Sequence, residues 1–183
     1  MTPNTLQSYG LVAKLLHWVM ALAIFGLFGL GIYMVGLDYY DPLYRTLPHI
    51  HKSVGVLLFV LLLIRWGWRM GSRQPQPIGS TNEQRVAHWA HLTLYALMAL
   101  IMVSGYLIST ADGRAIDVFN WFAVPATLTD IDNQEDIAGD IHEILAWVLI
   151  VLAALHALAA LKHHFIDKDN TLKRMTFFKG DSK

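Results

Sequence analysis

The sequence predicts an all-α integral membrane protein, a single four-helix bundle with both termini in the cytoplasm. Of the 183 residues, 55% are apolar and 15% are charged. In a soluble domain about a quarter of the residues are charged. The mean hydropathy of +0.41 also favours a lipid environment. Finally, the chain contains four apolar runs near the length of about 20 residues that a helix needs to cross a bilayer.

We expect the four membrane spans over residues 15–37, 49–70, 86–111 and 141–163. The first and third contain no Asp, Glu, Lys or Arg. The second reaches full length only if its polar ends lie at the membrane surface, where long cationic side chains can extend into water. The fourth has Glu143 near its start and Lys162 near its end. Because four crossings return the chain to its starting side, both termini lie on one side of the membrane.

The basic residues predict which side that is. Eleven of the 14 lie with the termini and the 65–85 segment, and only Arg45, Lys52 and Arg114 lie on the other side. Cytoplasmic segments carry the excess of Lys and Arg in membrane proteins, so we expect the termini in the cytoplasm. The remaining assignments are an extracytoplasmic loop at 112–140 and a cytoplasmic tail at 166–183.

Composition excludes several classes of function. The formal net charge is zero, so the chain lacks the basic field that attracts nucleic acid, and we expect no nucleic-acid partner. The sequence has no cysteine, which excludes disulfides, iron–sulfur clusters and covalent c-type haem. The nine histidines are therefore the main candidates for metal ligation.

Two histidines of the fourth span are spaced to face one side of a helix. His142 and His156 are 14 residues apart. At 100° and 1.5 Å per residue, this spacing returns to within about 40° of the same face after a rise of about 21 Å. One face of the fourth span thus presents an imidazole near each membrane surface.

The predicted topology gives each of these imidazoles a partner. His51, at the start of the second span, lies at the outer level with His142, and His17 lies at the inner level with His156. Two imidazoles on facing helices can hold a haem iron from both sides, an arrangement that suits electron transfer because no coordination position stays open. Gly55 and Gly139 would leave room for a flat ring, although they would equally allow close helix packing.

Spacing alone leaves alternatives at both levels. His49 lies about 200° around the helix from His51, so both cannot face one haem, and we favour the deeper His51. His88 and His91 lie one turn apart in the third span, and either could replace His17 as the partner of His156.

Two other hypotheses explain the histidines without haem. They could simply bind carbonyl groups or lie among lipid headgroups, which is the interpretation we favour for His163 and His164. They could also line a path for divalent metal ions, and the protein would then be a histidine-lined metal transporter. Such paths usually include carboxylates within the membrane, and the first and third spans contain none.

Several short stretches can be compared with a known family. They are His17-Trp18, residues 51–55 (HKSVG), residues 87–92 (AHWAHL), His142-Glu143, and residues 155–165 with 168–175 near the C-terminus. Over nearly the whole chain, these stretches resemble the bacterial cytochrome b561 family of small dihaem membrane proteins. The resemblance implies two non-covalent haem b groups, one held by His17 and His156 and the other by His51 and His142.

The resemblance also implies a location in the bacterial inner membrane, ubiquinone as electron partner and superoxide as the periplasmic electron donor. Superoxide is an anion, whereas the extracytoplasmic segments carry ten acidic and three basic residues, so we expect local attraction by Lys52 beside His51. His88, His91 and His163 are candidates for the quinone site, because quinone reduction takes up protons. Alternatively, the protein is a cytochrome b subunit that relays electrons from a soluble dehydrogenase docked on the acidic loop.

Overall fold

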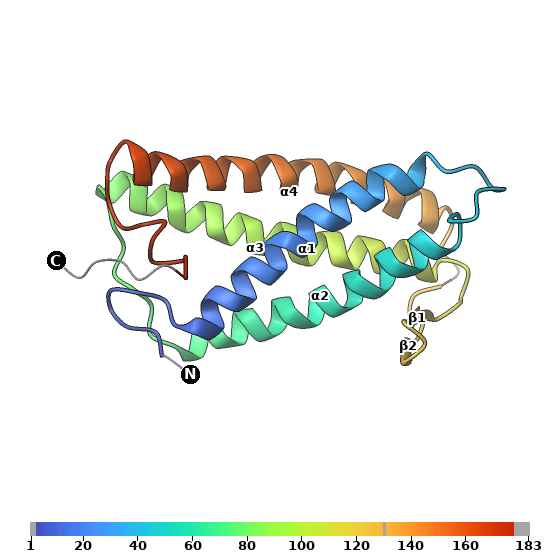
Figure 1. Ribbon diagram of the computed structural model, residues 1–183. Helices are drawn as coiled ribbons and strands as arrows, with labels where there is room; N and C mark the ends of the chain where they lie inside the picture. Colours follow the sequence, from blue (N-terminus) through green and yellow to red (C-terminus); the bar gives the residue numbers. More distant parts are fainter. Residues whose placement is uncertain (1–2, 130, 178–183) are drawn as a thin grey trace.

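The computed structural model, described here for residues 3–129 and 131–177, is dominated by four long helices (Figure 1). They are α1 (Leu11–Val35), α2 (Thr46–Gly71), α3 (Thr81–Thr110) and α4 (Gln134–Phe165). Two short strands, β1 (Ile116–Val118) and β2 (Phe122–Val124), lie between α3 and α4. Each helix is long and apolar enough to cross a membrane, which confirms the predicted four-helix membrane bundle.

The bundle consists of two helix pairs. α1 packs mainly against α2 and α4 mainly against α3, while α2 and α3 join the pairs and α1 hardly contacts α4. In Figure 1, α1 crosses the bundle obliquely, whereas α3 and α4 run side by side. A small buried core that includes Met20, Leu58 and Leu149 lies between the two histidine levels. Most other apolar side chains are exposed, as expected for a surface that faces lipid.

The two ends of the bundle differ in structure. The end that carries the start of α1 and the end of α4 is called the inner end, and the opposite end is called the outer end. At the inner end the tail folds back, and the indole Nε1 of Trp18 donates to the carbonyl oxygen of Met175 at 2.8 Å. At the outer end the two strands pair in antiparallel register, with Ile116 opposite Val124 (Figure 1). Which end faces the cytoplasm stays a prediction.

The helices extend beyond several predicted span boundaries. Residues 134–140 of the predicted 112–140 loop form the first turns of α4, and α3 begins at Thr81 instead of residue 86. The apolar runs between charged residues indicate the part of a helix that lies in the hydrocarbon core. Where the helix itself begins depends on other residues, such as those that cap its first turn. At α3, the side chain of Ser80 and that of Glu83 form a capping box. α1 ends at Val35, before the predicted residue 37. Residues 178–183 of the predicted tail lie outside the described part of the chain.

Candidate functional site

The predicted outer pair is brought together between α2 and α4. The ring centroids of His51 and His142 lie 6.2 Å apart, and both side chains are partly buried. His142 has a defined orientation, because its Nδ1 lies 2.9 Å from the carbonyl oxygen of Ile101 and 3.0 Å from the hydroxyl of Ser104. Since a carbonyl can only accept, Nδ1 carries the hydrogen and Nε2 keeps its lone pair for a metal.

His51 has no comparable partner. Its Nδ1 is buried without a hydrogen-bond partner among the described residues. A buried polar nitrogen is costly to leave unpaired, so this ring has a nitrogen available to a group that the protein binds. A Cβ atom at Gly31 of α1 would lie 3.5 Å from Cε1 of His51, and one at Gly105 of α3 would lie 3.1 Å from Cε1 of His142. These two glycines therefore make room for the imidazole rings.

The inner level holds three histidines instead of two. The ring centroid of His156 lies 6.3 Å from that of His17 and 5.1 Å from that of His91. All three side chains are partly buried, and they come from α4, α1 and α3. His88 is exposed and its ring contacts Trp89, so the structure does not bring it to His156. Of the two alternatives to His17, only His91 is near.

The distances between ring centroids distinguish His17 from His91 as the partner of His156. A first-row metal lies about 2 Å from an imidazole nitrogen, and that nitrogen lies about 1.1 Å from the centroid of its ring. Two imidazoles on opposite sides of one iron should therefore have centroids about 6 Å apart. The pairs His51–His142 and His17–His156, at 6.2 and 6.3 Å, match this value, whereas His91–His156 at 5.1 Å is too close. The residues present thus fit two bis-histidine haem sites.

The packing of the bundle also fits a flat group at these positions. α1 and α4 hardly contact each other, yet His17 and His156 approach across the seam between them. A Cβ atom at Gly55 or Gly139 would meet nothing within 4 Å, so there is open space one turn from His51 and from His142. Close packing does not explain these glycines, because nothing packs against them.

The β1–β2 hairpin is fixed beside the outer pair. The hydroxyl of Ser53, a fully buried residue on α2, accepts a hydrogen bond of 3.1 Å from the backbone N–H of Phe119. The ring of Phe119 in turn contacts His49, with centroids 6.2 Å apart. Phe119 adopts a φ of +48°, which a bulky residue rarely does. His49 thus belongs to the hairpin contact and His51 to the histidine pair.

The cations at the outer end differ in whether a carboxylate already pairs with them. Lys52 is exposed next to His51. Arg114 is paired with Asp112, to which its Nε donates at 2.6 Å, and this hydrogen bond from Arg114 lowers the pKa of the Asp112 carboxyl. Because Asp112 already balances Arg114, Lys52 is the better placed cation for an anion that approaches the outer pair.

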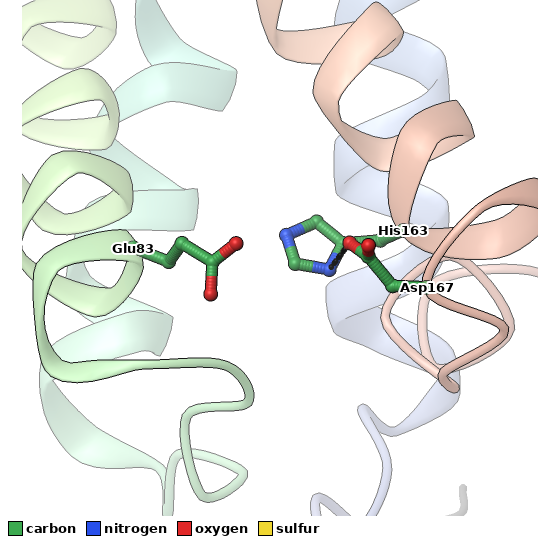
Figure 2. Close-up of side chains that lie close together, drawn as sticks. All are labelled: Glu83, His163 and Asp167. Carbon is green, nitrogen blue, oxygen red and sulfur yellow. Dashed lines mark ion pairs between the residues drawn. The ribbon is translucent and has the colours of Figure 1, made fainter.

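The third quinone candidate, His163, lies in a charged network at the inner end. Its Nδ1 lies 2.6 Å from Asp169 and 3.1 Å from Asp167, while Lys162 contacts Asp167 at 2.8 Å and Glu83 at 3.2 Å. Glu83, His163 and Asp167 point toward one another (Figure 2), with possible ligand atoms within 4.8 Å. The ammonium group of Lys162 contacts both carboxylates and would repel a metal cation. The network instead ties the start of α3 to the end of α4.

Comparison with known proteins is consistent with this geometry. The family model described as "Prokaryotic cytochrome b561" matches residues 8–178. "Cytochrome b561 homolog 2" of Escherichia coli (strain K12) is 51% identical over 174 residues, which cover 94% of this chain and 93% of that protein. "Probable superoxide oxidase CybB" of Yersinia pestis is 28% identical over 163 residues, 87% of this chain and 90% of that protein. "Cytochrome b561 homolog 1" of Escherichia coli (strain K12) is 30% identical over 72% of this chain and 76% of that protein.

Proposed function

We propose that this chain, which belongs to the prokaryotic cytochrome b561 family, binds two haem b groups and carries electrons from one membrane surface to the other. Family membership makes it a multi-pass membrane electron-transfer protein with b-type haem. The observation that carries the proposal of two haems is the pair of histidine separations, 6.2 Å at the outer end and 6.3 Å at the inner end. Bound haem supplies the one-electron chemistry.

The chain's own residues would hold and insulate the two haems. His51 and His142 would hold the outer haem, with the Ile101 carbonyl fixing the His142 ring, and His17 and His156 would hold the inner haem. The apolar core between the levels excludes water from the path. Four ligands on three helices would also hold the two helix pairs together, because α1 and α4 otherwise hardly contact each other.

We propose superoxide as the periplasmic donor and ubiquinone as the acceptor, in the bacterial inner membrane. Two superoxide anions would each lose one electron and become dioxygen, while one ubiquinone would take up two electrons and two protons. The name of the Yersinia pestis relative supports the donor. Lys52 supports it as well, because it offers an exposed positive charge beside His51. The histidines at the inner end would donate the protons for quinone reduction, and among them His91 lies nearest to the inner pair.

A turnover assay tests this reaction. The purified holoprotein in ubiquinone-containing vesicles is supplied with enzymatically generated superoxide, and ubiquinol is measured. We expect ubiquinol to form and superoxide dismutase to suppress it. Ubiquinol formation that does not respond to dismutase would exclude superoxide as the donor, while leaving the electron-transfer function intact.

The acidic outer surface favours a second candidate, a relay subunit for a soluble periplasmic dehydrogenase. Asp132, Glu135, Asp136 and Asp140 are exposed around the start of α4 and would repel superoxide at long range. They would attract a basic protein surface. Co-purification of such a dehydrogenase, with haem reduction by its substrate, would favour this role. The metal-transporter hypothesis predicts a haem-free protein, and membership of a cytochrome family argues against it.

A further inference from the structure

Arg65 is a cation held inside the inner end of the bundle. It belongs to α2 and is partly buried. Its Nε donates to the hydroxyl of Tyr95 at 2.8 Å and its Nη1 points to the carbonyl oxygen of Ala13 at 3.5 Å. The guanidinium carbon also lies 5.9 Å from the centroid of the Tyr95 ring. These contacts orient the guanidinium group, but every one of them is to a neutral group.

The contacts place Arg65 beside the inner histidines. Ala13 precedes His17 by one turn of α1, and Tyr95 follows His91 by one turn of α3. Arg65 also lines one cavity together with Ala13, Leu16 and Tyr95, and Leu16 is the neighbour of His17 along the chain. One cation from α2 is therefore held at the level of the inner pair by the two helices that carry His17 and His91.

The described residues do not supply a counter-ion for Arg65. Within residues 3–129 and 131–177, no carboxylate forms an ion pair with it, and the acidic residues Glu83, Asp167 and Asp169 at the inner end are paired with Lys162 or His163. A guanidinium group has five N–H donors, and a cation at membrane depth is costly without an anion. Arg65 is thus oriented for an anion that none of the described residues supplies.

We propose that Arg65 binds a propionate carboxylate of the inner haem, an inference that rests on the proposed function. Haem b carries two propionates, and a carboxylate inside a membrane protein needs a cation as much as Arg65 needs an anion. The planar guanidinium group matches a carboxylate with two parallel hydrogen bonds. Arg69, one turn further along α2, lines the same cavity as Arg65 and adds a second positive charge there.

Resonance Raman spectra and redox titrations of the purified holoprotein test this role. The variants are Arg65→Gln, which removes the charge, and Arg65→Lys, which keeps the charge but loses the planar guanidinium group and its two parallel donors. Arg73→Gln removes an exposed arginine from the same end and serves as the matched control. We expect the propionate bending band to shift in both Arg65 variants and to stay unchanged in the control.

The redox titration should separate the effect of the positive charge of Arg65 from the effect of its hydrogen bonds to the propionate. In Arg65→Gln the equilibrium constant for reduction of the inner haem should fall about tenfold, about 59 mV for one electron, because a nearby positive charge favours the reduced form. In Arg65→Lys it should stay within about threefold of wild type, and the outer haem should be unaffected in both.

An unchanged propionate band in Arg65→Lys, with both haems present, overturns the proposal, since the guanidinium would then bind another anion such as a lipid phosphate. If Arg65→Gln fails to retain the inner haem, the Arg65→Lys spectrum still decides. A wild-type protein without haem would contradict the proposed function itself, which is a different result.

Discussion

The carbonyl oxygen of Ile101 on α3 accepts a hydrogen bond of 2.9 Å from Nδ1 of His142 on α4. The hydroxyl of Ser104 lies 3.0 Å from the same nitrogen and donates to the same carbonyl at 2.9 Å. This arrangement fixes the tautomer of His142 and leaves the lone pair of Nε2 available to a metal. The proposed outer site therefore depends on α3, although neither of its two proposed ligands belongs to α3.

Ser104→Ala should weaken the outer site without abolishing it. Groups that orient a ligating histidine typically contribute 10–100-fold to affinity, and because the Ile101 carbonyl remains, we expect about a tenfold loss of outer-haem affinity. Haem retention during dilution in detergent measures it, with Ser109→Ala on the same helix as control. Equal retention in the two variants would mean that Ser104 has no role in holding His142.

Gly105→Val should displace the ring of His142, because even a Cβ atom at this position would lie 3.1 Å from Cε1. We expect loss of the outer haem and retention of the inner one, seen as about half the wild-type haem content per chain. Gly67→Ala is the control, since a Cβ there meets nothing within 4 Å. A Gly105→Val protein with a full haem content would show that the ring has another way to reach its ligand position.

The choice between His17 and His91 can be tested directly. We expect His17→Ala to lose the inner haem and His91→Ala to keep both haems, because only the His17–His156 separation matches axial ligation. Haem content and low-spin visible spectra measure the outcome. The opposite pattern would assign His91 as the ligand and leave His17 as its neighbour.

Ser53→Ala should loosen the β1–β2 hairpin. The substitution leaves the N–H of Phe119 without its partner, which costs about 1–3 kcal/mol for a buried donor. We expect a lower midpoint of thermal unfolding and faster proteolysis within the hairpin. Ala123→Ser, at an exposed position of the hairpin, should change neither. Unchanged proteolysis in Ser53→Ala would show that the hairpin is held by other contacts.

Lys52→Ala should slow superoxide oxidation about threefold at low ionic strength, with a smaller effect at high salt, because screening weakens the attraction of an exposed charge. Arg114→Ala is the matched control, since Asp112 already balances the charge of Arg114. Stopped-flow haem reduction by superoxide measures both. If Lys52→Ala reduces its haem at the wild-type rate and with the wild-type salt dependence, Lys52 does not attract superoxide to the outer pair.

The sequence was sufficient to predict the four helices, because apolar runs and charges report directly on membrane crossing. Helix periodicity and topology also predicted that His51 lies near His142. For His156 they left His17, His88 and His91 as alternatives, and the structure brings both His17 and His91 close to it. The first turns of α4, from Gln134 onward, lie outside the apolar run, so the hydropathy pattern did not show them. The β1–β2 hairpin likewise carries no strong turn signal, since its turn uses Phe119 and Asn120 at positive φ instead of glycine.

The groups that support the site could not be predicted in this way. Gly31, Gly105 and the carbonyl of Ile101 act on histidines of other helices, and their contacts depend on how the helices rotate against each other. Arg65 was expected only as a cation at the end of a span, and its direction into the bundle follows from Tyr95 and Ala13. No spacing rule within one helix shows such contacts.

The central claim, two bis-histidine haem sites at the two ends of one bundle, is tested most directly by haem content. A reduced-minus-oxidised visible spectrum of the purified protein, combined with haem extraction and quantification per chain, should give two low-spin b haems. His51→Ala and His156→Ala should each reduce this to one. A single haem in the wild-type protein, or none when haem is available during expression, would contradict the claim.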